Sequence, residues 1–319
     1  MNPEEIYLSV IVPCFNEEEV IGETYRRLTQ VVQSQGWRYE LVFINDGSRD
    51  KTLTLLKQLA VQDPRVRVLS FSRNFGHQPA VSAGIRYCSG TIAIIIDADL
   101  QDPPELFPAM VDLYQKEQAN VVYAVRKERK GESFFKLWSA RTFYRLINSL
   151  SEVPLPLDTG DFRLIDAKVI REFKKLQERN KYIRGLISWM GFKQVPIEYS
   201  REERFAGATK YPLSKMLKFA QTGLLYFSKK PLTVALSLGF ISILVGLGLA
   251  VWVFASSVLR PQSLVPGWAS TVIMVIFFGG IQLLTIGVLG EYIGSIFDEL
   301  KKRPEFIVSE SINFDEDVQ

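Results

Sequence analysis

Two long, almost wholly apolar runs constrain this chain more than any other feature. They cover Leu232–Leu259 and Ala269–Gly290, and neither contains a charged residue. A helix needs about 20 apolar residues to cross a bilayer. Two buried helices of a soluble protein are the alternative, which is disfavoured because no amphipathic pattern interrupts either run. We therefore expect a transmembrane helical hairpin over residues 231–296.

Basic residues flank this hairpin and predict its orientation. Lys229–Lys230 precede the first run and Lys301–Arg303 follow the second, whereas only Arg260 lies between them. Because loops rich in Lys and Arg stay in the cytoplasm, both termini and the N-terminal domain are expected there. No basic segment with a long apolar core opens the sequence, so no signal peptide is expected. Glycines within the spans would permit close helix packing, and self-association is therefore plausible.

The remaining composition gives broad limits. A chain of 319 residues, 47% of them hydrophobic, has room for one α/β domain besides the membrane part. The net charge of +3 says little about partners, and no nucleic-acid partner is expected. Cys14 and Cys88 fall in predicted core elements, and we interpret both as reduced packing residues.

Short apolar runs alternate with helical stretches from Leu8 to about Arg126. This alternation predicts a doubly wound, Rossmann-like, mostly parallel sheet in a domain over residues 1–211. A dinucleotide site is disfavoured because no G-x-G-x-x-G follows the first strand. The expected strands are Leu8–Cys14, Tyr39–Ile44, Val66–Phe71, Thr91–Ile96, Asn120–Val125, Phe162–Ile165 and Gln194–Tyr199, and the expected helices are Glu17–Gln35, Asp50–Val61, Gln78–Cys88 and Pro104–Glu117.

Three further segments lie outside the expected α/β elements and the two apolar runs. Residues 212–230 carry apolar side chains at three- and four-residue spacing, which predicts an amphipathic juxtamembrane helix. Ser133–Leu150 interleaves aromatic and basic residues, as a core helix with a basic face or a helix at the membrane surface would. Residues 297–319 are expected to be a cytoplasmic tail, disordered over its acidic end Glu310–Gln319.

An acidic pair follows the predicted strand Thr91–Ile96. Ligands of open α/β sheets bind outside the carboxyl ends of the strands, where Asp97 and Asp99 would lie. Two carboxylates, with further oxygens from Gln101 and Asp102, suit Mg²⁺ or Mn²⁺ bound together with substrate phosphates. The alternative is a pair of turn residues that cap the helix after Pro103–Pro104.

Two further polar turns are expected at the same edge. Pro13–Glu18 follows the first strand and Asn45–Ser48 follows the second. Asn-Asp-Gly-Ser alone is an ordinary turn. The convergence of three polar turns favours a nucleotide site in which Asp46 and Glu17 contact the base and the ribose.

Other polar residues carry weaker signals. His77 is the only histidine, so neither a serine triad nor a zinc cluster can be built around it with credible partners, and a local role at a helix start is preferred. The cluster that begins at Arg126 and continues with Lys127, Arg129 and Lys130 is either a solvated loop or a basic loop that captures phosphate.

An ordered set of motifs runs through the first domain. These are Pro13-x-Phe15-Asn16-Glu17, Asn45-Asp46-Gly47-Ser48, Arg73-Asn74-Phe75-Gly76, Asp97 to Glu105 and Gly160-Asp161-Phe162-Arg163-Leu164. The set resembles the polyprenyl-phosphate glycosyltransferases of the GT-A fold, in glycosyltransferase family two. The bactoprenol glucosyltransferases are the more similar branch and the dolichol-phosphate mannose synthases the more distant one.

The resemblance implies roles for individual residues. Asp97, Asp99 and Gln101 would surround the metal and the sugar-nucleotide diphosphate, and Pro13 belongs to a motif at the nucleotide. Asp161 matches a position near the sugar. Arg126 and Arg141 match phosphate-binding arginines, and Arg204 and Lys210 match a segment that closes over the donor or the acceptor phosphate. Asp102 stands where many mannose synthases carry histidine, which favours the glucosyl branch.

The implied reaction is inverting transfer of a hexose, expected to be glucose, from UDP to undecaprenyl phosphate at the inner face of a bacterial cytoplasmic membrane. Another UDP-sugar or GDP-mannose would use the same chemistry. A processive polysaccharide synthase is disfavoured because no Gln-x-x-Arg-Trp segment is present. An inactive membrane scaffold is disfavoured because Asp97, Asp99 and the arginines are intact.

Overall fold

The computed structural model describes residues 7–126, 159–178, 181–200, 230–259 and 267–314. These residues form two compact units. The first contains the described residues before 201 and after 302, and the second contains two long helices. The segments Ser133–Leu150 and 212–227, for which helices are expected, lie outside the described residues.

The described part of the first unit is built on an eight-stranded sheet with strand order β7-β5-β6-β4-β1-β2-β3-β8. β1 pairs in parallel with β2 and β4, β2 with β3, and β5 with β7, whereas β6 is antiparallel to both β4 and β5. This confirms the mostly parallel sheet. The strands are β1 Leu8–Cys14, β2 Tyr39–Asn45, β3 Val66–Phe71, β4 Ile92–Ile95, β5 Val121–Arg126, β6 Thr159–Asp166, β7 Gln194–Tyr199 and β8 Val308–Ile312.

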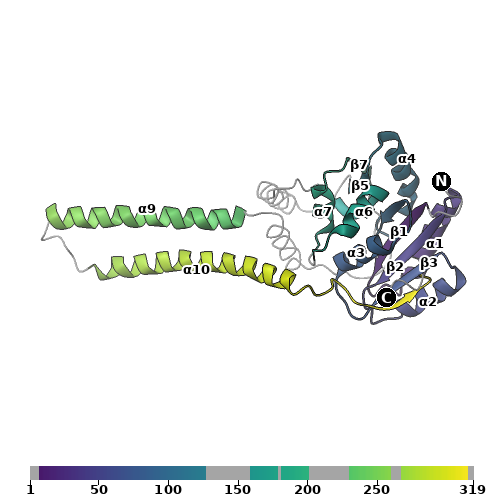
Figure 1. Cartoon of the computed structure of the whole chain (residues 1–319), viewed down its shortest axis with the longest axis horizontal. Coiled ribbons are helices and arrows are strands. Elements are labelled where there is room, and N and C mark those ends of the chain that lie inside the picture. The colour runs from purple at the N-terminus through teal and green to yellow at the C-terminus, as the bar shows by residue number, and fades with distance from the viewer. Residues whose placement is uncertain (1–6, 127–158, 179–180, 201–229, 260–266, 315–319) are drawn as a thin grey trace. The chain divides into compact units, whose positions relative to one another are not determined.

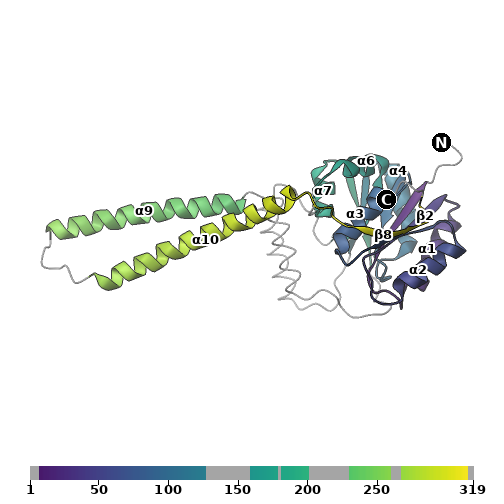
Figure 2. The same ribbon diagram turned by 60° about the horizontal axis from the view of Figure 1, so that its bottom comes forward.

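Helices cover both faces of the sheet (Figures 1 and 2). Val10 and Val12 of β1 share a buried cluster with residues of three helices, α1 (Ile21–Ser34), α2 (Thr52–Gln62) and α4 (Phe107–Glu117). A short 3₁₀ turn, Pro104–Leu106, directly precedes α4. Ile11, between these two valines, faces the opposite side, as strand side chains alternate. There α3 (His77–Tyr87) lies so close that a Cβ on Gly84 would be 2.2 Å from Cγ2 of Ile11. α6 (Ala167–Lys175) and α7 (Ile183–Trp189) pack against α3.

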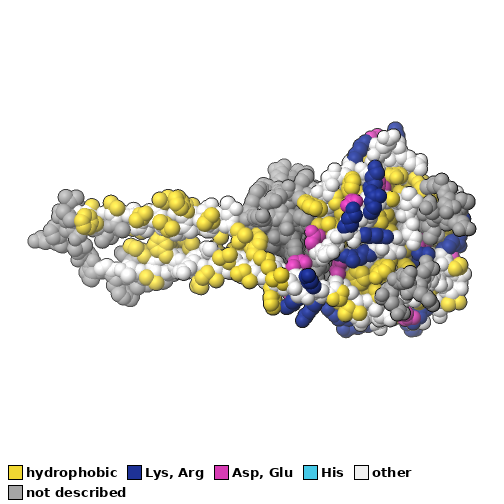
Figure 3. All heavy atoms as spheres, in the orientation of Figure 1, with side chains coloured by type: hydrophobic (Ala, Val, Ile, Leu, Met, Phe, Trp, Pro, Cys, Tyr) yellow, Lys and Arg dark blue, Asp and Glu magenta, His cyan; other side chains and the backbone are white. Residues whose placement is uncertain are grey.

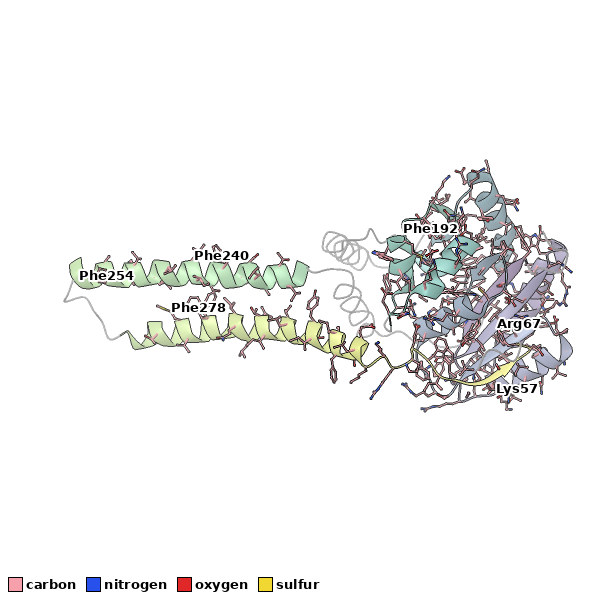
Figure 4. All side chains as sticks on the ribbon, in the orientation of Figure 1. Lys57, Arg67, Phe192, Phe240, Phe254 and Phe278 are labelled. Atoms are coloured by element: carbon pink, nitrogen blue, oxygen red, sulfur yellow. The ribbon has the colours of Figure 1, made fainter. Side chains whose placement is uncertain are left out.

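The second unit is a helical hairpin. α9 (Lys230–Leu259) and α10 (Trp268–Leu300) run side by side in both ribbon views. Phe278 of α10, labelled in Figure 4, lies 3.7 Å from the place where a Cβ on Gly246 of α9 would stand. Both helices are long and apolar enough to cross a membrane, and large hydrophobic side chains are exposed along them (Figure 3). Such surfaces indicate association with a membrane.

The segment after α10 differs from expectation. Disorder was predicted from Glu310 onwards, and this prediction is wrong for Glu310–Phe314, because β8 pairs antiparallel with β3 and Glu310 lies opposite Ser70. The carboxamide of Asn313 then donates hydrogen bonds to the carbonyls of Ala60 and Val66, at 2.9 and 2.8 Å. Charge and small polar residues predict disorder locally, but here an open sheet edge supplies hydrogen-bond partners.

Candidate active site

The topology brings several polar chain segments to one edge of the sheet. The parallel strands β1 to β4 all end there, with Cys14 opposite Asn45 and Ile11 opposite Ile95. β6 runs the other way, so its beginning lies at the same edge. Arg163 pairs with Ile95, which places Asp161, two residues earlier on β6, beside the residues that follow β4.

The acidic pair occupies the turn after β4. Asp97 and Asp99 are half-buried, with the buried Ala98 between them. Leu100 has a φ of 57°, which turns the chain so that the amide of Gln101 donates to Oδ1 of Asp99 at 3.2 Å. Within the described ranges, no group of three or more His, Cys, Asp or Glu side chains is arranged to hold a metal ion by itself.

His77 connects this turn to β6. It is the first residue of α3, as its expected helix-start role requires, but its side chain also reaches both acidic segments. Nε2 lies 2.9 Å from Oδ1 of Asp97, and Nδ1 lies 3.4 Å from Oδ2 of Asp161. Burial alone would lower the pKa of His77, but the hydrogen bond and charge of Asp97, together with the charge of Asp161, raise it to about 9. The imidazole thus lies between two carboxylates and contacts both.

Asp161 is held from two helices. The amide of Gln78 in α3 donates to Oδ2 at 3.1 Å, and Nε of Arg184 in α7 lies 3.0 Å from Oδ1. Burial alone would raise the pKa of Asp161, but the charges of Arg184 and His77 outweigh it and lower the pKa to about 2. A carboxylate with such a pKa is a weak proton acceptor at neutral pH, so its surroundings favour a fixed negative charge rather than a general base.

Asp46 holds the turn that follows β3. Its Oδ1 accepts a hydrogen bond from the amide of Phe75 at 2.6 Å, and its Oδ2 accepts from Gly76 N and Asn74 Nδ2 at 2.9 and 2.8 Å. Burial raises the pKa of Asp46, and the backbone donors act against that rise. Gly47 has a φ of 62°, and a Cβ there would lie 2.3 Å from the carbonyl carbon of Arg73, so the close approach of the two turns requires glycine.

The turns after β1 and β2 are joined by hydrogen bonds. The amide of Asn16 donates to Oγ of Ser48 at 2.9 Å, and the amide of Glu17 donates to Oγ1 of Thr52 at 2.8 Å. Pro13 is buried within β1, immediately before this turn. The predicted polar turns therefore do converge, with Glu17 half-buried at the same edge as Asp46.

A second polar group lies at the ends of β5 and β7, which are neighbours in the sheet. The hydroxyl of Tyr199 donates to Oδ1 of the buried Asp102 at 2.5 Å, and Nε of Arg126 donates to the same hydroxyl at 3.4 Å. Burial and the adjacent Asp102 carboxylate raise the pKa of Tyr199. Tyr199 thus connects Arg126 to the turn that contains the acidic pair.

Comparison with known proteins identifies the family. Residues 9–174 match the model of the family described as "Glycosyl transferase family 2". The chain belongs to this family. It is 49% identical to an uncharacterized glycosyltransferase, YkcC, of Bacillus subtilis, over 96% of this chain and 94% of that protein. It is 39% identical to the bactoprenol glucosyl transferase of Shigella phage SfII, over 95% of this chain and 98% of that protein. A prophage homologue of that enzyme in Escherichia coli is also 39% identical, over 94% of this chain and 98% of its own.

Solved structures give a more remote likeness. Glucosyl-3-phosphoglycerate synthase of Mycobacterium tuberculosis, in complex with Mn²⁺, UDP-glucose and phosphoglyceric acid, is 19% identical with a TM-score of 0.47. The match covers 69% of this chain and 78% of that one.

The site of this family 2 glycosyltransferase contains residues that the motifs alone did not single out. His77, Gln78, Arg184 and Tyr199 were not expected there. A signal for His77 was present, because it follows a predicted strand that ends at the same edge as the acidic pair. No signal in the sequence indicated Arg184 and Tyr199. Their places at the site depend on β6, because Arg184 pairs with Asp161 of β6 and β6 lies between β4 and β5, the neighbour of the strand that ends at Tyr199. Three expected site residues, Arg141, Arg204 and Lys210, lie outside the described residues.

Proposed function

We propose that this glycosyltransferase moves glucose from UDP-glucose to a polyprenyl phosphate, with inversion at the anomeric carbon. The observation that carries the proposal is the position of Asp97 and Asp99 at the carboxyl end of β4, in a unit whose sheet edge also receives Arg126. Full-length relatives named bactoprenol glucosyl transferase support both the sugar and the lipid acceptor.

Mg²⁺ or Mn²⁺ would be held by Asp97, Asp99 and Gln101 together with the donor diphosphate. Carboxylate and amide oxygens are the donors that such hard cations prefer, and these cations are often bound through one or two carboxylates plus substrate phosphates. The side-chain chemistry therefore fits without a cluster of three protein carboxylates. When bound, the cation would neutralise charge on the departing diphosphate.

The protein would position the donor through the turns after β1 and β2. Glu17 and Asp46 would contact the ribose and the base, and Pro13 would shape the start of the turn that carries Glu17. Asp46 would do this while it fixes the Asn74–Gly76 turn through three hydrogen bonds. Asp161, near the sugar in this arrangement, would act as a fixed charge.

The acceptor would supply its own nucleophile. A phosphate oxygen is ionised at neutral pH, so it can form the new bond to the anomeric carbon while the bond to UDP breaks and UDP leaves with the electron pair. No strong general base is needed, which agrees with the low pKa of Asp161. Arg126 would hold a phosphate group, with Arg141, Arg204 and Lys210 as further proposed phosphate ligands.

The lipid acceptor would explain the apolar hairpin. Basic residues on both outer flanks would keep the catalytic unit and both termini in the cytoplasm, at the membrane face where a polyprenyl phosphate presents its headgroup. A transferase with GDP-mannose or another UDP-sugar as donor is the second candidate. Those donors also carry a diphosphate, which Asp97 and Asp99 would bind through a metal in the same way.

The test is transfer of labelled sugar to undecaprenyl phosphate by the purified full-length protein. UDP-glucose, UDP-galactose, UDP-N-acetylglucosamine and GDP-mannose would be compared, each with Mg²⁺ and with excess chelator. We expect product from UDP-glucose in the presence of the metal. Product from GDP-mannose alone would contradict the donor assignment, and no transfer from any donor would contradict the proposed reaction.

A further inference from the structure

The segment that follows α10 is part of the catalytic unit. Residues 303–314 group with the sheet rather than with the helical hairpin, and β8 lies along the outer side of β3 (Figure 2). The hydroxyl of Ser309 donates to the carbonyl of Ser70 at 3.0 Å, and the ring of Phe306 stacks on Phe71 with centroids 4.9 Å apart. The chain that leaves the second long helix therefore completes the catalytic unit.

Glu305 inserts a carboxylate between two elements of that unit. Its Oε2 lies 2.6 Å from Nζ of Lys181 and accepts a hydrogen bond from the hydroxyl of Ser82 at 2.9 Å. The Lys181 side chain is fully buried and that of Glu305 is 7% exposed. Ser82 belongs to α3, whereas Lys181 lies two residues before the start of α7. Glu305 thus connects α3 with the entrance to α7.

These same two helices hold the polar network around Asp97 and Asp161, at the edge of the sheet where β1 to β4 end. α3 supplies His77, which contacts Asp97, and Gln78, whose Oε1 accepts a hydrogen bond from the amide of Ile183 at 3.0 Å. α7 supplies Arg184, which pairs with Asp161. A shift of α3 relative to α7 would therefore move groups that surround both carboxylates.

We propose that Glu305 is a positioning residue for the transfer reaction: by joining Ser82 to Lys181 it fixes α3 against α7, and thereby fixes the surroundings of Asp97 and Asp161. Glu305 acts through these helices and does not touch the donor or the acceptor. The inference rests on the proposed function in one respect: sugar transfer must take place beside Asp97 and Asp161.

The ion pair is better suited to fixing geometry than to adding stability. Among the described residues, Oε1 of Glu305 has no hydrogen-bond partner, and burial raises the pKa of Glu305 despite the charge of Lys181. Removing two charges from water costs free energy that their attraction only partly returns. A tight, directional contact nevertheless remains between segments far apart in the sequence.

The same segment offers a matched control. Glu310 of β8 pairs with Lys57 of α2, labelled in Figure 4, at 2.7 Å. Both of these side chains are more than 40% exposed, at 44% for Lys57 and 41% for Glu310, and neither touches α3 or α7 in the contacts described. Glu305→Gln and Glu310→Gln thus make the same chemical change in the same segment at two different places.

The experiment compares wild type and both variants as full-length proteins, by hydrogen exchange over His77–Tyr87 and Ile183–Trp189 and by sugar transfer per UDP-binding site. We expect Glu305→Gln to speed exchange in these two helices and to lower turnover about 10-fold, while Glu310→Gln changes neither. Counting UDP-binding sites corrects turnover for any unfolded fraction.

Two results would overturn the inference. One is either wild-type turnover or wild-type exchange of these two helices in Glu305→Gln. The other is exchange that rises equally in β1, β2 and β4, since this would reveal a general loss of stability. The exchange measurement needs neither donor nor acceptor, so failure of the positioning role is distinguishable from failure of the proposed reaction.

Discussion

Nε2 of His77 lies 2.9 Å from Oδ1 of Asp97, although the two residues are separated by a helix and a strand. This contact orients the first carboxylate of the proposed metal site. We predict that His77→Ala raises the Mn²⁺ concentration needed for half-maximal transfer about 10-fold, because a ligand loses the group that holds it. His77→Gln, whose amide nitrogen can replace Nε2, should recover part of the loss. Equal metal dependence in all three proteins would contradict this role.

Tyr199 is predicted to position Arg126. Its hydroxyl contacts both Asp102 and Arg126, so Tyr199→Phe removes one donor from a buried carboxylate and one acceptor from the guanidinium. We expect the KM for the phosphate-bearing substrate that Arg126 binds to rise, and the free energy of unfolding to fall by about 1–3 kcal/mol. Steady-state kinetics and denaturant titration would measure the two effects. An unchanged KM for both substrates would leave Tyr199 without a role at the site.

Both cysteines are predicted to resist alkylation in the folded protein. Cys14 and Cys88 are buried, and burial raises the pKa of Cys88 to about 12. Because the thiolate is the reactive form, its population at pH 8 is much smaller than for an ordinary thiol, and reactivity would rise only at far higher pH. Maleimide labelling followed by mass spectrometry should find both thiols unmodified before denaturation and modified after it. Rapid labelling of the native protein would show that these elements open readily.

Asn313 is predicted to contribute to stability through its side chain and its backbone. Its φ is 59°, and its carboxamide donates to two carbonyl groups. Asn313→Gly removes the two hydrogen bonds, at about 0.5–1.5 kcal/mol each, and also removes the Cβ from the left-handed backbone. Asn313→Ala removes the same hydrogen bonds but keeps a Cβ in the left-handed region, so the alanine variant should be about 1 kcal/mol less stable than the glycine variant. Thermal unfolding of the two variants separates these effects, and equal midpoints would argue against strain at this position.

The pattern of apolar runs predicted β1 to β5 closely, because buried parallel strands are short, β-branched and bounded by polar turns. The direction of β6 could not be predicted, since a short run such as Phe162–Ile165 is apolar in either orientation. That direction is what brings Asp161 to the acidic turn. The role of His77 was missed although one of its partners, Asp97, was expected at the same edge of the sheet. Its second partner, Asp161, comes from β6, whose direction no local pattern indicates.

β8 shows a second limit of local sequence. Val308–Ile312 carries serine and glutamate between its apolar residues, and its strand conformation depends on the edge of β3, more than 200 positions away in the chain. The buried contact between Glu305 and Lys181 likewise joins two charged residues that appear solvated in the sequence. Contacts with distant parts of the chain therefore determine both the strand conformation of β8 and the burial of the Glu305–Lys181 pair.

Asp97 and Asp99 are proposed to bind the donor diphosphate through a divalent cation. The most direct measurement is calorimetric titration of UDP into the full-length protein, with Mn²⁺ and with chelator, for wild type, Asp99→Asn and Asp112→Asn. Asp112 is an exposed residue of α4 and serves as the matched control. We expect Mn²⁺-dependent binding to wild type and Asp112→Asn, and affinity at least about 10-fold weaker for Asp99→Asn. Equal UDP affinity in all three proteins, with or without Mn²⁺, would contradict metal-mediated binding of the diphosphate at Asp99.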